Sequence, residues 1–363
     1  MNFLRPRVAL LPVLAASTLL LSACAPGATS PTLTPNPPGT SEPATQAPQE
    51  SQERTLVVYS GRSESLVGPI IEQFEAASGI TVKVRYANSI EMAAQLLEEG
   101  TRTPAQVFLS QEAGALGALN NAKLLVPLPA EVTGAVDAHY TPSDNSWVAL
   151  TGRARIVAYD SEKLTEAEVP ANVHDLTKPE WKGRVGFAPT NASFQSFVTA
   201  MRVIEGEAAA EQWLNGLIAN EAQTFPGNNP ILEAVNTGAL DLGLINHYYW
   251  VVAAAEAGGP EAMRAQLKFG EAGTVSALVN VTGAGILTGS EDSAEALEFV
   301  KFLVSEQAQT FFVQQTGEYS LVPGATGPAN VPALADLGGP ELAFSELADL
   351  EGTVALLQKV GLI

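Results

Sequence analysis

Two adjacent tyrosines, Tyr248 and Tyr249, have the side-chain chemistry that is most informative in this chain. A phenol has a pKa of about 10 in water, and a small, highly charged cation beside it displaces the proton, so that the phenolate becomes a hard oxygen ligand. Ferric iron is the cation that best fits paired phenolates. Most tyrosines, however, pack as aromatic rings with a polar tip, and the pair alone favours that ordinary packing.

The tyrosines follow a predicted strand and open a predicted helix. Residues 240–245 form a short apolar run bounded by turn formers, which indicates a strand covered on both faces. Residues 250–256 predict a helix that ends at Gly258-Gly259-Pro260. Ligands of open α/β sheets bind at the carboxyl ends of the strands, so we expect Asn246 and the tyrosine pair to border a crevice.

Other polar loops also follow predicted strands or open predicted helices, and they could converge on the same crevice. They comprise residues 60–63, 110–112, 190–193 and 228–229. Helix amino ends carry free N–H groups that bind small oxyanions. Taken alone, residues 190–193 and Asn228 predict only plain helix caps.

The wider pattern predicts an α/β fold of more than one domain. Residues 55–86 have the strand–helix–strand order of a βαβ unit, whose strands are expected to be parallel. Two long strand patterns, at residues 147–160 and 274–287, are long enough to cross between domains. A chain of 363 residues with 46% hydrophobic residues can bury a large core and suggests two domains.

The amino-terminal residues predict export from the cytoplasm. Residues 1–23 have the basic start and apolar middle of a secretory signal peptide. Leu21-Ser22-Ala23-Cys24 resembles a bacterial lipoprotein box, which implies cleavage before Cys24 and lipidation of that residue. Cys24 is the only cysteine, so disulfides and a cysteine nucleophile are excluded from the remaining chain. Residues 24–54 are rich in Pro, Thr and Ser and predict a flexible tether.

The charge of the chain limits its partners. The formal net charge is −20, which argues against nucleic acid or an anionic lipid surface as a partner, because both require a basic patch.

Five segments are distinctive in combination: VYSGRSESLVGPIIEQFEAASGITVKV, VFLSQEAGALGALNNAKLLVPLP, SWVALTGRARIVAYDSEKL, PEWKGRVGFAPTNASF and LINHYYW. Together they resemble the periplasmic ferric-ion-binding proteins of bacterial iron ABC transporters, with LINHYYW the most specific piece. The resemblance runs from Leu56 to Val322 in the same order. It implies a two-lobed periplasmic-binding-protein fold of the α/β class, with central mixed sheets and two crossover strands. Lobe 1 is then residues 55–150 plus 275–330, and lobe 2 is residues 151–274 plus 331–363.

The resemblance also implies a site. Tyr248 and Tyr249 match the paired ferric ligands of the family. Members that co-bind phosphate or carbonate hold the anion at positions that match Asn191, Ala192, Ser193, Asn228 and Asn246. These positions keep backbone N–H groups, a hydroxyl and amides as donors.

Two positions depart from the family pattern. Known members have a histidine ligand where this chain has Ser63, which is a poor ferric ligand. They have Glu-Gln where this chain has Gln111-Glu112, so the order is transposed. Either Glu112 reaches the metal while Gln111 lies near the anion, or the carboxylate ligand is lost. His247 is expected to point away from the ligand oxygens.

The implied function is that of a receptor and not of an enzyme. A monomeric protein, lipid-anchored at the cell envelope through Cys24, would bind Fe3+ with phosphate or carbonate and deliver it to an ABC transporter permease. An alternative is an ABC-transporter receptor for another small anion, a phosphonate or a polyamine, without iron. An enzyme on the same fold would need a nucleophile or an acid/base pair in the site, and no Ser-His-Asp order suggests itself.

Overall fold

The computed structural model describes residues 53–363. The predicted signal peptide, Cys24 and most of the predicted tether therefore lie outside the described residues. Among the helices of the described part, none combines the length and apolar character that crossing a bilayer requires.

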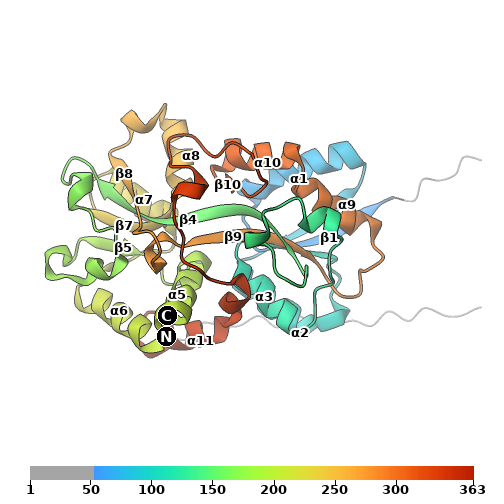
Figure 1. The fold of residues 1–363 in the computed structure, drawn as a ribbon, viewed down its shortest axis with the longest axis horizontal. Coiled ribbons are helices and arrows are strands. Elements are labelled where there is room, and N and C mark those ends of the chain that lie inside the picture. The colour runs from blue at the N-terminus through green and yellow to red at the C-terminus, as the bar shows by residue number, and fades with distance from the viewer. Residues whose placement is uncertain (1–52) are drawn as a thin grey trace, which may run out of the picture. The chain divides into compact units, whose positions relative to one another are not determined.

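The strands form one mixed, ten-stranded sheet (Figure 1). Their bounds are β1 Thr55–Ser60, β2 Thr81–Tyr86, β3 Val107–Ser110, β4 Val148–Asp160, β5 Val185–Phe187, β6 Gln223–Thr224, β7 Leu242–Asn246, β8 Ala265–Phe269, β9 Val279–Ile286 and β10 Tyr319–Ser320. The main order is β2-β1-β3-β9-β4-β7-β5-β6, and β8 and β10 also pair with β4. Parallel pairs at both ends flank antiparallel pairs in the middle, which makes the sheet mixed.

Strand β4 joins the two halves of this sheet. Its residues 148–154 pair with β9, and residues 155–159 pair with β7, so one strand belongs to both halves. All thirteen residues of β4 are buried. This confirms the expectation that residues 147–160 cross between the halves. The second long pattern was predicted too long, because Val275–Ala277 form a 3-10 turn and β9 begins only at Val279.

Eleven α-helices of the described residues surround the sheet. Their bounds are α1 Glu64–Ser78, α2 Ser89–Glu99, α3 Ala113–Asn121, α4 Ala130–Thr133, α5 Ala192–Glu205, α6 Glu207–Ala219, α7 Asn228–Asn236, α8 His247–Ala257, α9 Ala294–Leu303, α10 Glu306–Phe311 and α11 Leu350–Lys359. Figure 1 shows α1, α2, α3, α9 and α10 around β1, and α5–α8 around the strands β5–β8. Because β4 and β9 run between these two groups, residues from both groups can meet beside the two strands.

Apolar faces attach the helices to the core. Helix α1 buries Val67, Ile70, Ile71 and Phe74, which lie on one side of a helix at this spacing. Phe74 packs against Phe299 of α9 with ring centroids 5.0 Å apart. The helix ends at Gly79, which has a left-handed φ of 69° that glycine adopts without steric cost.

The carboxyl-terminal segment contacts helices of both groups. On α3, Gly114 and Gly117 lie against Leu347 and Ala348 of the short helix η10 (Phe344–Ala348). On α5, the Thr199 hydroxyl lies 2.7 Å from that of Thr353 in α11. The segment after residue 330 therefore touches both groups of helices, and the lobe boundaries given above stay a prediction.

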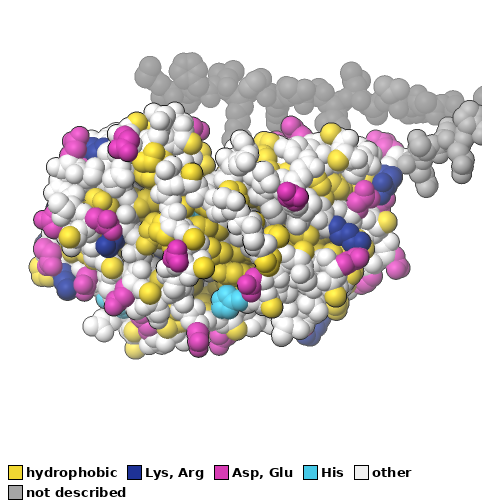
Figure 2. Space-filling model, turned by 45° about the horizontal axis from the view of Figure 1, so that its top comes forward, with side chains coloured by type: hydrophobic (Ala, Val, Ile, Leu, Met, Phe, Trp, Pro, Cys, Tyr) yellow, Lys and Arg dark blue, Asp and Glu magenta, His cyan; other side chains and the backbone are white. Residues whose placement is uncertain are grey.

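Acidic side chains are scattered over the face in Figure 2, whereas basic ones are sparse there. This distribution agrees with the negative net charge of the chain.

Candidate functional site

The tyrosine pair lies where the sequence places it, directly after β7. The strand ends at Asn246 and α8 begins at His247. The rings of Tyr248 and Tyr249 stack with centroids 4.2 Å apart. Tyr248 is buried and its hydroxyl has no hydrogen-bond partner, whereas Tyr249 is half-buried. Burial raises the pKa of Tyr248 well above its ordinary value, because the charged phenolate loses its water.

The amino end of α5 brings three of the predicted anion-binding residues together. Asn191 caps the helix, and its Oδ1 accepts hydrogen bonds from the Ser193 N–H at 3.0 Å and the Ser193 hydroxyl at 2.6 Å. The Asn228 amide lies 3.4 Å from both Asn191 Oδ1 and Ser193 Oγ. Ala192 is the first residue of α5, so its backbone N–H lies in the unpaired first turn.

The expectation that Asn228 caps its own helix is wrong. Helix α7 already begins at Asn228, its cap residue is Gly227, and no side chain caps it. The Asn228 side chain is instead buried and directed at Asn191 and Ser193. It therefore contributes to the polar group around the amino end of α5.

Asn246 joins the same group through Arg155. Arg155 pairs with Asn246 in the β4–β7 register. Its Nη1 lies 3.4 Å from Asn246 Oδ1 and 3.5 Å from Ser193 Oγ. Arg155 therefore links Asn246 to Ser193, which in turn contacts the side chains of Asn191 and Asn228.

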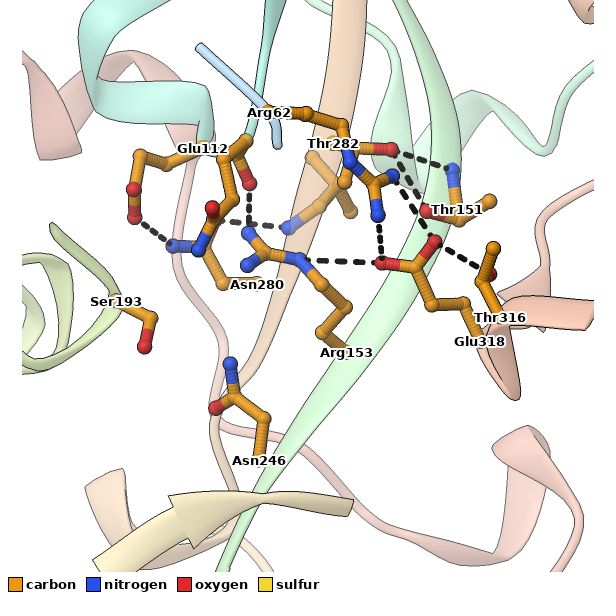
Figure 3. Close-up of polar contacts among 12 residues, drawn as sticks. Arg62, Glu112, Thr151, Arg153, Ser193, Asn246, Asn280, Thr282, Thr316 and Glu318 are labelled. Atoms are coloured by element: carbon orange, nitrogen blue, oxygen red, sulfur yellow. Dashed lines mark hydrogen bonds and ion pairs between the residues drawn. The ribbon is translucent and has the colours of Figure 1, made fainter. Parts of the chain in front are cut away.

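Glu112 reaches the group from α3. It is the amino-terminal cap residue of α3 and is fully buried. Its Oε2 lies 3.5 Å from the Asn280 amide of β9, whereas its Oε1 has no partner (Figure 3). Burial raises the pKa of Glu112, and the charge of Arg153 and the hydroxyl of Ser196 partly offset this.

Gln111 takes part through its backbone and not through its side chain. Its carbonyl accepts a hydrogen bond from Arg153, and its N–H donates to the Ser89 hydroxyl at 2.8 Å. Ser63 is exposed, and its hydroxyl bonds to that of Ser65 rather than to a residue of the group. Of the two positions that depart from the family pattern, Gln111-Glu112 is the one whose contacts reach the group.

His247 faces the core. Its Nδ1 accepts a hydrogen bond from the Ala154 N–H at 3.1 Å, and its ring stacks on Tyr319 with centroids 4.5 Å apart. Burial lowers the pKa of His247 to about 3, so the imidazole is neutral at physiological pH.

Three buried arginines near these residues were not predicted as site residues from the sequence. Arg62 bonds to Glu318, and Arg153 Nε lies 3.9 Å from the same carboxylate (Figure 3). Arg155 has no carboxylate partner among residues 53–363. Residues 152–155 contained a signal for two of these arginines. Arg153 and Arg155 are two apart on a strand and therefore share one face, and charged residues are rare in a buried apolar strand.

Buried polar atoms without partners concentrate in this region. We define the polar cluster as the polar residues around Arg155 and Glu112 together with Ala192 and the tyrosine pair that follows Asn246, namely Glu112, Arg153, Arg155, Asn191, Ala192, Ser193, Ser196, Asn228, Asn246, Tyr248, Tyr249 and Asn280. Within it, unpartnered atoms belong to Glu112, Arg153, Arg155, Asn228 and Tyr248. Because native proteins satisfy nearly all buried polar groups, such a concentration indicates a ligand site. In the described residues, no three His, Cys, Asp or Glu side chains gather in a metal-binding group.

Comparison with known sequences assigns the chain to a family. The profile of the bacterial extracellular solute-binding protein family matches residues 102–336. The chain belongs to this family. The prediction that it is a binding protein and not an enzyme is thereby confirmed.

The relatives of this solute-binding protein include iron-binding proteins. The chain is 36% identical to the major ferric iron-binding protein of Neisseria meningitidis over 309 residues, which are 85% of this chain and 93% of the relative. It is 32% identical to the Fe(3+)-binding periplasmic protein of Serratia marcescens over 86% of this chain and 92% of the relative. The resemblance inferred from the five segments is confirmed by these relatives.

A solved structure confirms the fold class. Iron-bound HitA from Pseudomonas aeruginosa superimposes with a TM-score of 0.80 at 33% sequence identity, covering 85% of this chain and 99% of that one. The solute-binding protein therefore has the two-lobed α/β fold that was expected.

Proposed function

We propose that this solute-binding protein is the ferric-iron receptor of an ABC transporter. It takes Fe3+ together with phosphate or carbonate into the polar cluster and delivers the iron to a membrane permease. The observation that carries the proposal is the buried, unpartnered hydroxyl of Tyr248, stacked against Tyr249. The ferric-binding relatives support the same function.

The iron ligands are the phenolates of Tyr248 and Tyr249 and the carboxylate of Glu112. The raised pKa of Tyr248 keeps its phenol protonated in the iron-free protein. A trivalent cation displaces this proton, so iron binding releases protons and is favoured by rising pH. The free Oε1 of Glu112 gives a third hard oxygen, and it reaches the cluster from α3.

The anion binds at the amino end of α5. Backbone N–H groups of the first turn, at Ala192 and Ser193, face an anion with the positive end of the helix dipole. The amides of Asn228 and Asn246 and the hydroxyl of Ser193 add hydrogen-bonding groups. Gln111 borders the anion from the opposite side, because Arg153 holds its backbone beside Glu112.

Binding closes the two lobes over the iron. The residues of the cluster come from the cap of α3 and from β9 on one side and from β7, α5, α7 and α8 on the other, with Arg153 and Arg155 on β4 between them. A ligand therefore contacts both groups at once only when the groups approach. Bending in β4 and β9 allows this motion, and the ligand shifts the equilibrium toward the closed form. A permease that recognises the closed form then receives iron from a monomeric receptor, which is anchored outside the cytoplasm by a lipid on Cys24.

Ferric iron supplied from a chelated donor tests the proposal. Coordination by phenolates produces a visible charge-transfer absorption band in the wild-type protein. Tyr248→Phe combined with Tyr249→Phe abolishes the band, whereas Tyr86→Phe, a half-buried tyrosine on the edge strand β2, retains it. A wild-type protein without the band, or a double variant with an unchanged band, contradicts the proposal.

A second candidate is a receptor for a small anion without iron. The unpartnered nitrogens of Arg155 favour it, since they suit an anion. The serine at position 63 also favours it, since the ferric-binding family has a histidine ligand there. Calorimetry with phosphate in metal-free buffer separates the two functions. Tight phosphate binding by a protein that gives no iron band identifies the second.

A further inference from the structure

Arg155 differs from the two buried arginines nearby, Arg62 and Arg153, because no carboxylate of the described residues pairs with it. Arg62 and Arg153 share Glu318, at 2.9 and 3.9 Å. Among residues 53–363, no carboxylate lies within ion-pair distance of Arg155, although its side chain is buried. An isolated buried charge is costly, so a protein that keeps one usually supplies a counter-ion.

The free atoms of Arg155 lie on one edge of its guanidinium. Nη1 is used by Asn246 and Ser193, whereas Nε and Nη2 have no partner. The N–H bonds of Nε and Nη2 point the same way from the planar group. This pair forms the fork that binds two oxygens of one carboxylate, carbonate or phosphate through parallel hydrogen bonds.

The orientation of this fork is held by aromatic rings of α5. The guanidinium carbon of Arg155 lies 5.7 Å from the ring centroid of Phe194 and 5.6 Å from that of Phe197. Cation–π contacts of this kind fix the plane of the group and leave its edge available. Burial lowers the pKa of Arg155 to about 10, in agreement with a cation that lacks a full counter-charge.

We propose that the Nε–Nη2 edge of Arg155 is the bidentate anion seat of this protein and selects oxyanions that present two adjacent oxygens. The inference rests on the anion part of the proposed function and deepens it. Phosphate and carbonate fit the fork, and a spherical anion such as chloride does not. The helix amino end at Ser193 and the amide of Asn246 then position the anion, and Arg155 supplies the charge that holds it.

Calorimetry on the iron-free protein tests the seat directly. The wild type binds inorganic phosphate and bicarbonate but not chloride. Arg155→Lys keeps the charge and loses the fork, so its phosphate affinity falls at least about tenfold, and Arg155→Gln loses more. Arg184→Lys is the control, because Arg184 pairs with Asp241 outside the polar cluster, and it binds phosphate as the wild type does. A wild type that binds neither oxyanion, or an Arg155→Lys protein with unchanged phosphate affinity, overturns the inference.

A second variant keeps the test valid if the Arg155 variants fold poorly. Asn246→Asp places a carboxylate where Oδ1 now lies 3.4 Å from Arg155, and so gives the guanidinium an internal counter-ion. We expect this variant to bind phosphate at least about tenfold more weakly while unfolding at a temperature close to that of the wild type. Phosphate affinity equal to that of the wild type contradicts the seat.

The iron band separates failure of this inference from failure of the iron function. If the wild type forms the band and Arg155→Lys binds phosphate normally, the iron function stands and the seat is wrong. If the wild type forms no band but Arg155→Lys still loses phosphate, the seat stands and the iron function is wrong.

Discussion

Arg62 and Glu318 form a two-fold hydrogen-bonded ion pair, with Nη1 2.9 Å from Oε2 and Nη2 2.9 Å from Oε1. Both side chains are buried, and the Thr316 hydroxyl donates to the same carboxylate at 3.0 Å. The pair joins the loop after β1 to the residue before β10, next to the second cation, Arg153 (Figure 3). One carboxylate therefore compensates the charges of two arginines. These two positive charges also partly offset the burial that raises the pKa of Tyr248.

Glu318→Gln is expected to destabilise the iron-free protein by about 3–5 kcal/mol, because it leaves two buried guanidinium groups without a counter-charge. Urea unfolding followed by circular dichroism measures the loss. Glu131→Gln is a matched control, since Glu131 pairs with Lys301 at the surface, and we expect it to cost less than about 1 kcal/mol. Equal stability of the Glu318→Gln protein and the wild type would show that Arg62 and Arg153 are compensated in another way.

The buried His247 is expected to make the free energy of unfolding of the protein depend on pH. Its folded pKa of about 3 lies below the ordinary value of 6.5, so the unfolded chain binds a proton that the folded chain does not. Stability therefore falls as the pH drops from about 6.5 toward 3. At pH 5 this single group costs about 2 kcal/mol.

His247→Asn removes this component and keeps an acceptor for the Ala154 N–H. Unfolding free energies of the iron-free protein at pH 7.5 and pH 5 measure it, and the wild type should lose about 2 kcal/mol more than the variant. His139→Asn, at an exposed histidine, serves as the control and should behave as the wild type does. Parallel pH profiles of wild type and His247→Asn would contradict the burial argument.

Gly114 is expected to be essential for the contact between α3 and the carboxyl-terminal segment. A Cβ at this position lies 2.5 Å from the Leu347 carbonyl oxygen, closer than side chains approach, so Gly114→Ala forces the helix and the segment apart. We expect a loss of about 1–3 kcal/mol in thermal or urea unfolding. Gly68→Ala in α1 meets nothing nearer than Glu64 Cγ at 3.5 Å and should stabilise by up to about 1 kcal/mol. A Gly114→Ala protein as stable as Gly68→Ala would show that α3 moves without cost.

Local patterns in the sequence predicted the elements that carry the tyrosines and the anion-binding residues. The apolar run before Asn246 places the end of β7 to within one residue, because it depends on neighbouring residues. The helix predicted at residues 250–256 exists as α8, but it begins three residues earlier, at His247. The cap at Asn191 was likewise predictable from a local preference.

Contacts between distant residues could not be predicted in the same way. Arg155 meets Asn246 through the register of β4 with β7, and no local property of either residue sets that register. The segment after residue 330 was placed in one lobe, yet Leu347 touches α3 while Thr353 touches α5. Such contacts depend on packing across the whole fold, which residue types and spacing do not determine.

The transposed pair Gln111-Glu112 leads to a prediction about the iron itself. If the Glu112 carboxylate is an iron ligand, Glu112→Gln lowers ferric affinity at least about tenfold, because a neutral amide replaces a hard anionic oxygen. The iron-free variant should unfold like the wild type, since burial already raises the pKa of Glu112 and disfavours its charged form. Competition with citrate, followed by the charge-transfer band, measures the affinity.

The combined variant Gln111→Glu and Glu112→Gln is the matched control for charge. It keeps one carboxylate and restores the order expected from the resemblance. Recovery of ferric affinity in this variant shows that a carboxylate from either residue of the loop before α3 completes the iron shell. Wild-type affinity in Glu112→Gln alone would show the opposite, that phenolates and the anion suffice and that Glu112 serves the arginines beside it.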